Sequence, residues 1–291
     1  MKFVVAGAGY TGRRVLASLP AGSALALSRR PVDSGGQELR LVDFDARHAE
    51  PIRLPSPCCL LYTAPPGGDG GDARLAGLLA RLTPAPARVV YLSTSGVYGD
   101  RRGAVVDESA GTRAQSARAK RRVAAERLLG DWCRDRGAEL YVLRVPAIYG
   151  PGRLGLDRLR AGDPVLRDAD AGPGNRIHVD DLVECCLAAM QTQRAPPGIY
   201  NVGDGDDRSS SSFSRAVARL AGLPPPPELD LGAAARTWSR ERMSFVAESR
   251  RLDTRRMREV LGVRPKYGDP EDGIRASLAE EARSGQASAQ G

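Results

Sequence analysis

The sequence predicts an α/β protein with a Rossmann-type, doubly wound parallel sheet and a small carboxyl-terminal substrate lobe. Three observations lead to this fold class. Short, nearly continuous apolar strands alternate with amphipathic helices through the first half of the chain, which is typical of a parallel sheet covered on both faces. A glycine-rich turn joins the first strand to the first helix. After residue 150 the pattern loosens into a polar, glycine-rich segment.

The expected elements of the first half follow one another as strand and helix. Each strand is a short run rich in β-branched and apolar residues, and several of the runs end at Gly or Pro. These strands are 2–8, 23–28, 38–44, 58–64, 87–95 and 139–146. Each helix carries apolar residues at helical spacing, as Val123, Leu128, Leu129 and Trp132 do in the longest one. These helices are 11–19, 72–82 and 113–136.

The second half returns to regular structure after its polar segment. The pattern predicts a helix over 178–191, a strand over 198–203, a serine-capped helix over 209–222 and a basic helix over 250–262. We therefore expect three regions. Residues 1–150, completed by about 176–203, form the Rossmann-type domain. Residues 151–175 and 204–283 form the small substrate lobe, and residues 284–291 form a disordered tail.

Composition excludes several classes of protein. The 291 residues carry a net charge of +8, but Lys occurs only at positions 2, 120 and 266, and arginines and acids are interspersed. No nucleic-acid-binding signature accompanies them, so we expect no nucleic-acid partner. Five cysteines and two histidines show no metal-ligand spacing. Neither a signal peptide nor a membrane span is visible, so we expect a cytoplasmic protein with no membrane partner.

The segment GAGYTG (7–12) matches the dinucleotide-binding pattern G-x-G-x-x-G. It closes an expected strand and opens an expected helix, which is the context that gives the pattern meaning. Gly7 and Gly9 let the backbone turn and approach a pyrophosphate, and Gly12 lets the helix pack on the strand. Tyr10 and Thr11, at the helix amino terminus, then face the phosphates. The alternative is a tight strand-to-helix turn without a ligand.

The end of the second strand favours NADP over NAD. A carboxylate there would bind the ribose of NAD and repel a phosphate, but this chain has Ser28, Arg29 and Arg30. Guanidinium groups suit the 2′-phosphate of NADP. Asp43, which ends the third strand, can accept the adenine amino group or cap the next turn. Thr63 and Ala64 end the fourth strand at the same edge, and we expect them at the cofactor.

Four further segments resemble the extended short-chain dehydrogenase/reductases, the NAD-dependent epimerase/dehydratase family. They are YLSTSGVYG (91–99), LRVPAIYGPGR (143–153), RIHVDDLVECCLAAM (176–190) and IYNVGDG (199–205). With the amino-terminal glycines they run in family order over residues 1–205. The resemblance implies a Rossmann domain with a small lobe, and hydride transfer between NAD(P) and a substrate hydroxyl or carbonyl.

The resemblance also implies site residues. Thr94, with Ser95 beside it, falls where the family binds the substrate oxygen. Lys120 falls where a Lys binds the nicotinamide ribose and lowers the pKa of a catalytic Tyr. The Tyr position itself carries Ser116, and the first glycine of the family's G-x-x-G-x-x-G is Ala6. Both departures resemble an atypical subgroup that lacks the Tyr.

Serine is a poor general acid near pH 7, so hydride transfer would need another proton donor. Tyr149 ends the sixth strand on the side where ligands bind and is our candidate, although strand-end aromatics usually pack. Tyr98 lies near the same edge. Arg153, Arg167 and Arg176, in or next to the polar segment, are candidates for binding an anionic substrate.

Two functions remain open at this point. The first is an NADP-binding oxidoreductase or epimerase/dehydratase-like enzyme that acts on a small molecule, with anions among the candidate substrates. The second is a catalytically inactive NADP(H)-binding redox sensor or interaction module, which loss of the Tyr favours and retention of Thr94 and Lys120 disfavours. A homodimer through the helix over 113–136 is possible, because family members often associate in this way.

Overall fold

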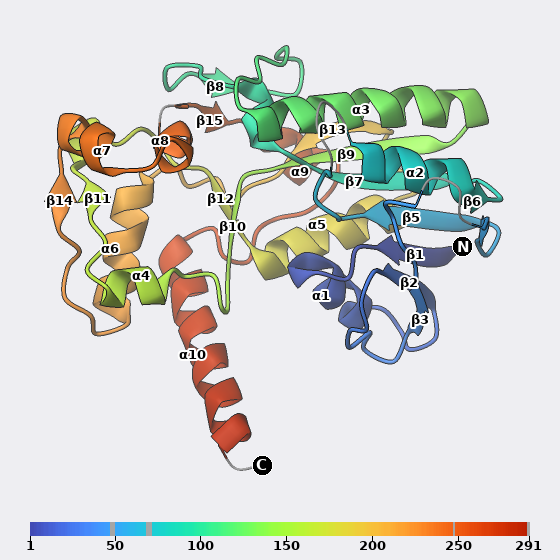
Figure 1. Cartoon of the computed structure of the whole chain (residues 1–291), viewed down its shortest axis with the longest axis horizontal. Helices are drawn as coiled ribbons and strands as arrows, with labels where there is room; N and C mark the ends of the chain where they lie inside the picture. The colour runs from blue at the N-terminus through green and yellow to red at the C-terminus, as the bar shows by residue number, and fades with distance from the viewer. Residues whose placement is uncertain (47–49, 68–71, 247, 290–291) are drawn as a thin grey trace.

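Seven parallel strands form the central sheet of the computed structural model (Figure 1), in the order β13-β9-β7-β5-β1-β2-β3. The structure describes residues 1–46, 50–67, 72–246 and 248–289. The strands are β1 (Lys2–Ala6), β2 (Ala24–Ser28), β3 (Glu38–Leu41), β5 (Cys58–Tyr62), β7 (Arg88–Thr94), β9 (Glu139–Val145) and β13 (Gly198–Asn201). The direction of winding reverses between β1 and β5, and ligands bind outside the carboxyl ends of strands at such a switch point.

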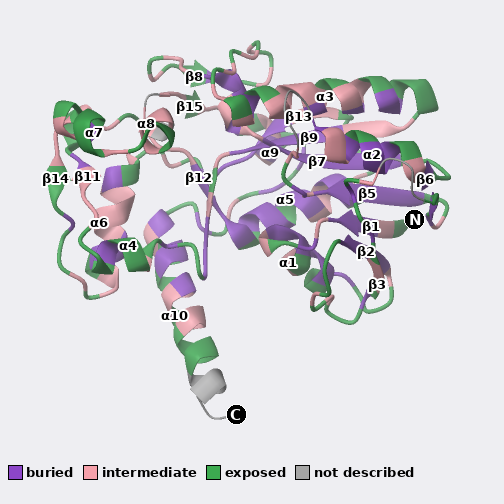
Figure 2. Ribbon diagram, viewed as in Figure 1, coloured by how far each residue is buried: buried purple, intermediate pink, exposed green. Residues whose placement is uncertain are grey.

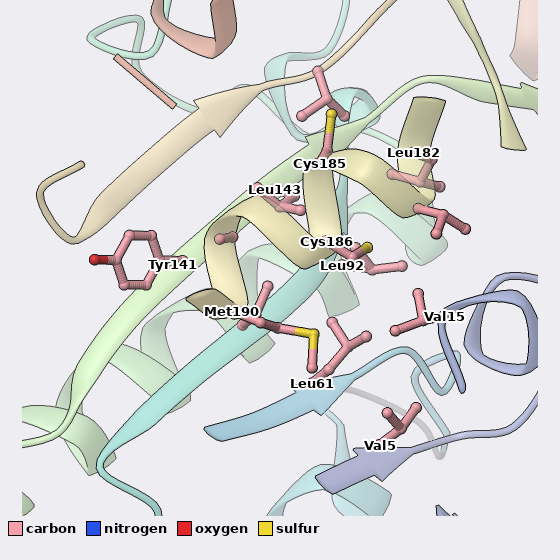
Figure 3. Packing of buried hydrophobic residues seen from close by; sticks show 14 of the residues in the cluster. Val5, Val15, Leu61, Leu92, Tyr141, Leu143, Leu182, Cys185, Cys186 and Met190 are labelled. Carbon is pink, nitrogen blue, oxygen red and sulfur yellow. The ribbon is translucent and has the colours of Figure 1, made fainter. Parts of the chain in front are cut away.

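Helices cover both faces of this sheet, so its strands are buried on both sides. Helices α1 (Tyr10–Ser18) and α5 (Val179–Gln191) share one face, and α2 (Ala73–Arg81) and α3 (Ala117–Arg136) cover the other. Figure 3 shows α5 laid across the strands with Cys185, Cys186 and Met190 among the apolar side chains of the first face. The predicted Rossmann-type fold is confirmed.

A smaller unit, built mostly after residue 146, packs beyond the carboxyl ends of the strands. Its helices are α4 (Leu156–Arg160), α6 (Ser210–Leu220), α7 (Leu231–Thr237), α8 (Arg240–Val246) and α10 (Pro270–Ala289). It has its own apolar cluster, which includes Tyr149, Leu159, Val217 and Ile274. Figure 2 shows this cluster as buried segments separate from those of the sheet.

Four pairs of very short strands were absent from the sequence prediction. They are β4 (Ile52–Arg53) with β6 (Leu82–Thr83), β8 (Val105–Val106) with β15 (Arg251–Leu252), β10 (Ala147–Tyr149) with β12 (Arg176–His178), and β11 (Val165–Leu166) with β14 (Glu228–Leu229). Segments of two or three residues are too short to show a periodicity, and their partners lie far away in the chain. The 3₁₀ turns η1 (Ser95–Tyr98) and η2 (Asp168–Asp170) complete the fold.

Three expected boundaries are corrected. The long helix begins at Ala117, not at residue 113, because the Ser116 hydroxyl caps it by accepting from the Ala119 amide (3.3 Å). The basic helix expected over 250–262 is strand β15 followed by the short helix α9 (Arg255–Glu259). Residues 284–289, expected in a disordered tail, continue α10, while residues 290–291 lie outside the described part.

The expected division into domains also needs one adjustment. Met257 and Leu261 lie in the part assigned to the substrate lobe, but they pack in the main core on the α5 face of the sheet. The chain therefore returns to the Rossmann unit before α10 crosses back to the lobe. Among the described helices, none is long and apolar enough to span a membrane.

Candidate functional site

The glycine turn after β1 is closed so tightly that two of its positions have no room for a side chain. A Cβ on Gly12 would lie 2.1 Å from the carbonyl oxygen of Gly7, and a Cβ on Gly7, whose φ is +105°, would lie 2.7 Å from the amide nitrogen of Ala64. Thr63 donates from its hydroxyl to the Gly7 carbonyl (2.5 Å). Gly9 differs, because a Cβ there would meet nothing within 4 Å. The open side of Gly9 is where a pyrophosphate would approach.

Helix α1 begins directly at this turn, and no side chain caps it. The N–H groups of Tyr10, Thr11 and Gly12 lie in its first turn and have no carbonyl of their own helix to donate to. Such an amino terminus attracts phosphate through these donors and through the helix dipole. The turn and α1 therefore have a shape that suits the pyrophosphate of a dinucleotide, and its binding there stays a prediction.

Tyr10 connects this turn to the small lobe. Its hydroxyl donates to the Pro151 carbonyl (2.9 Å), and the guanidinium carbons of Arg14 and Arg153 lie 4.2 and 3.9 Å from its ring centroid. Burial raises the pKa of Tyr10, against the opposing effect of the two arginines. Arg153, expected to bind substrate, thus lies beside the cofactor turn.

The end of β2 holds a carboxylate that the sequence pattern did not reveal. Arg29 donates to Asp45 (3.3 Å), and Arg74 also binds Asp45 (3.0 Å). The hydrogen bond from Arg74 is the main reason that the pKa of Asp45 is lowered. Ser28 donates to the Arg30 carbonyl (2.8 Å). Asp43 accepts from the Asp45 amide (2.9 Å) and so caps the turn, which is the alternative that the sequence left open.

A cavity of ≈ 560 Å³ lies between the carboxyl ends of the strands and the small lobe, within the ~300–1,000 Å³ usual for small-molecule sites. Thr94 and Ser95 line it from the end of β7. The Thr94 hydroxyl accepts from the Gly96 amide (3.1 Å), which leaves its own hydrogen free to donate. Four arginines line the same cavity: Arg118, Arg158, Arg242 and Arg250. The site thus combines the predicted hydroxyls with cations that the sequence pattern did not reveal.

The Ser116 and Lys120 pair does not line this cavity. The Ser116 hydroxyl serves as the α3 helix cap described above, and the Lys120 side chain is exposed. Arg118, two residues before Lys120, lines the cavity and donates to the Ser244 hydroxyl (3.3 Å). Residues two apart point to nearly opposite sides of a helix, so Arg118 faces the cavity and Lys120 does not.

Neither tyrosine considered as a proton donor lines the cavity. Tyr149 is 3% exposed in the core of the lobe, edge-on to His178 and Phe213, and burial raises the pKa of its hydroxyl. Tyr98 is fully buried and donates to the Asn201 side chain (2.7 Å). The structure gives both side chains a packing role, because each ring is enclosed by the protein and does not reach the cavity.

The other two arginines expected at the substrate are engaged elsewhere. Arg167 pairs with Asp170 (3.4 Å) and Asp230 (3.6 Å) on the surface of the lobe. Arg176 is 4% exposed and pairs with Asp206 (2.7 Å). Arg176 lines a second cavity of ≈ 600 Å³ with Phe213, on the side of α6 away from Thr94.

A buried ion pair supports the strand end that carries Thr94. Arg144 of β9 donates to both carboxylate oxygens of Glu126 on α3 (2.8 and 3.3 Å), and their side chains are 4% and 10% exposed. Ser93, next to Thr94, also donates to Glu126. The Arg144 guanidinium lies 4.7 Å from the Tyr98 ring centroid. This network fixes α3 relative to β7 and β9 beneath the site.

Asp204, which follows β13, is buried with one oxygen unpaired. Its Oδ1 accepts from the Asp206 amide (2.9 Å), whereas its Oδ2 has no partner among the described residues. Burial raises the pKa of Asp204 to about 7. The unfolded chain, with a pKa of ~3.9, releases this proton earlier. The folded state is therefore favoured at low pH, and this contribution is lost as pH rises from about 4 to about 7.

We expect Asp204→Asn to remove this pH dependence. Relative to wild type, the variant should gain free energy of unfolding between about pH 4 and pH 7, with a slope approaching ~1.4 kcal/mol per pH unit, and the gain should level off above that. Urea denaturation at pH 5, 6, 7 and 8 measures it. Asp135→Asn, an exposed change on α3, is the control. A gain that is independent of pH would show that Asp204 is not the titrating group.

The fold and the cavity define a Rossmann-type α/β protein with a second, cavity-forming lobe. Residues 70–203 match the model of the NAD dependent epimerase/dehydratase family, so this part of the chain is similar to that family. Among the described residues, no cluster of His, Cys, Asp or Glu could hold a metal ion.

Three relatives show the range of the likeness. A functionally unknown conserved protein from Silicibacter pomeroyi is 31% identical, with a TM-score of 0.80 over 96% of this chain and 98% of its own. MoeE5, solved with UDP-glucose and NAD, has a TM-score of 0.75 over 98% and 99% of the two chains but is only 22% identical, so it shows the fold alone. A 3-diazoavenalumate denitrifying reductase from Streptomyces sp is 31% identical over 46% of this chain and 45% of its own.

The chain spans 45–60% of the length of the curated relatives that it matches. The solved structures therefore show the fold, and NAD dependence is a proposal. Activity and substrate need arguments from the residues of this chain.

Proposed function

We propose that the protein is an NAD(P)-dependent oxidoreductase, or an epimerase/dehydratase-like enzyme, that acts on a small molecule bound in the cavity beside Thr94 and Ser95. One observation carries the proposal. The open amino terminus of α1, at Gly9, and the two cavity hydroxyls lie at the same edge of one parallel sheet. A nicotinamide dinucleotide supplies the hydride chemistry when it is bound there.

In this proposal, the residues of the chain bind and orient the dinucleotide and the substrate. The first-turn amides of α1 hold the pyrophosphate, and Gly9 leaves room for it. Thr94 and Ser95 hold the substrate oxygen by hydrogen bonds. Ser116 and Lys120 remain candidates only if they turn toward the site, since Ser116 caps α3 and Lys120 is exposed.

We propose further that NADP is accepted as the dinucleotide. Arg29 and Arg30, at the end of β2, are exposed, and guanidinium groups suit a 2′-phosphate. Asp45 competes with a 2′-phosphate for Arg29, because its carboxylate already pairs with that guanidinium. A bound 2′-phosphate must therefore displace Asp45 from Arg29, while Arg74 retains it.

Calorimetric titration with NADPH, NADP, NADH and NAD tests the cofactor, on wild type and on Arg29→Asp. We expect NADPH to bind wild type and to lose at least tenfold in affinity in the variant, while NADH changes less. Arg127→Asp, at an exposed arginine of α3, is the matched control for net charge. If none of the four nucleotides binds wild type, the glycine segment is only a turn and the enzyme proposal fails with it.

A second function has support from the same geometry. The capping Ser116, the exposed Lys120 and the buried Tyr149 leave the family's proton donor without a replacement side chain, which favours a redox sensor that binds NADP(H) without turnover. Such a sensor should bind the oxidised and reduced cofactors with different affinity. It should show no NADPH oxidation with any member of a panel of aldehydes, ketones and nucleotide sugars, whereas turnover with one of them would exclude it.

A further inference from the structure

The serine run 209–212 has no role in the function proposed above. Ser209 caps α6, because its hydroxyl accepts from the Ser212 amide (3.0 Å). Ser210, Ser211 and Ser214 line the 560 Å³ cavity, whereas Ser212 lines the second cavity on the other side of α6. The run therefore presents hydroxyls to the cavity that also holds Thr94.

Among these serines, Ser211 gives the best evidence for a bound ligand. It is 4% exposed and lines the cavity, and its hydroxyl has no hydrogen-bond partner among the described residues. Because this hydroxyl opens onto the cavity, water or a ligand in the cavity can serve as its hydrogen-bond partner. The N–H groups of Ser210 and Ser211 lie in the first turn of α6 and have no carbonyl of their own helix to donate to. Donors thus gather at this end of the cavity.

The charges around the cavity also favour an anionic ligand. Its described lining holds Arg118, Arg158, Arg242 and Arg250 but only one acid, Glu248. Glu248 pairs with Arg250 (3.0 Å), and Asp163 lies against Arg158 (2.9 Å) and Arg242 (3.7 Å). Asp100 also lies near Arg250. The lining itself holds four arginines and one acid, so the field at the cavity surface is positive, and the dipole of α6 adds to this. The field favours an anion over a neutral molecule of the same shape.

Most of the remaining lining is apolar, which favours a ligand with an apolar body. Pro146, Val165, Leu166, Trp238 and Val246 contribute to the cavity wall. A small cavity with an apolar wall and a few polar groups binds an organic body and orients it through those groups. An inorganic ion alone would leave this wall unused.

We propose that the substrate is a small organic oxyanion whose charged group is held by the Ser211 hydroxyl and the first-turn amides of α6. Its apolar body lies along the wall, and its reacting oxygen reaches Thr94 and Ser95; this last placement rests on the function proposed above. The carboxylate and the phosphate monoester share the required chemistry, and the test separates them.

The test titrates benzoate, phenyl phosphate and benzamide into wild type, Ser211→Asp and Ser212→Asp. Both variants place one acid in the first turn of α6, but only the first places it in the cavity. We expect one of the two anions to bind wild type and Ser212→Asp equally and to bind Ser211→Asp at least tenfold more weakly. Neutral benzamide should bind wild type at least tenfold more weakly than that anion. Ser211→Ala, which adds no charge, should weaken the same anion by a smaller factor.

Which anion binds identifies the charged group as a carboxylate or a phosphate. Equal anion binding to wild type and Ser211→Asp would overturn the proposal, as would benzamide binding as tightly as the anions or neither anion binding at millimolar concentration. NADPH titration of the same variants reports separately on the cofactor site. Absence of anion binding with NADPH binding intact would reject this inference alone, and failure of NADPH with anion binding intact would reject only the function proposed above.

Discussion

Replacing Glu126 by leucine is expected to destabilise the protein by about 3–5 kcal/mol, because it leaves the buried Arg144 charge without an acid. The Arg144 side chain is 4% exposed and binds both oxygens of Glu126. The guanidinium cannot lose its proton to escape the cost. Urea denaturation gives the change in free energy of unfolding.

The double variant Glu126→Leu/Arg144→Leu separates the ion pair from ordinary packing. Replacing both buried partners by apolar residues is often close to neutral, so the double variant should recover most of the stability lost by Glu126→Leu. Asp131→Ala, which removes an exposed ion pair with Arg134 on the same helix, should change stability by less than about 1 kcal/mol. If the double variant is as unstable as Glu126→Leu, the network stabilises the fold through the packing of its side chains and not through charge balance.

Replacing Gly12 by alanine is expected to abolish dinucleotide binding and to destabilise the fold. The added Cβ would lie 2.1 Å from the Gly7 carbonyl oxygen, so α1 or the turn must move, at a cost of about 1–3 kcal/mol or more. The first-turn amides then no longer present a fixed set of donors to the phosphates. Thermal denaturation and NADPH titration measure the two effects.

Gly9→Ala is the matched variant for this prediction. Its Cβ meets nothing within 4 Å in the protein, so the melting temperature should stay close to that of wild type. Its affinity for NADPH should nevertheless fall at least tenfold, because the methyl group occupies the path of the pyrophosphate. Unchanged NADPH affinity in Gly9→Ala would show that the dinucleotide does not approach this turn.

The sheet could be predicted from the sequence because its signals are local. Runs such as CCLLY carry enough apolar residues to predict a strand buried on both faces, and β5 does extend over Cys58–Tyr62 with every residue buried. The glycine turn was equally visible, since the need for glycine at positions 7 and 12 comes from a backbone packed on itself. Order and spacing along the chain sufficed for these features.

The substrate side could not be predicted in this way. Arg118, Arg242 and Arg250 come from separate segments of the chain and meet only when the lobe folds against the strand ends. In a chain with so many arginines, no local pattern distinguishes them from surface cations such as Arg167. Whether Ser116 is an acid substitute or a helix cap depended on one hydrogen bond at the start of α3.

The sequence by itself indicated the class of fold and the glycine turn, because both show as local patterns of residues along the chain. Only the tertiary structure decided that Tyr149 packs in the lobe, that Asp45 binds Arg29, and that Ser211 faces a cationic cavity with no hydrogen-bond partner among the described residues. Those outcomes depend on which distant side chains exclude water from one another, and periodicity carries no information about that.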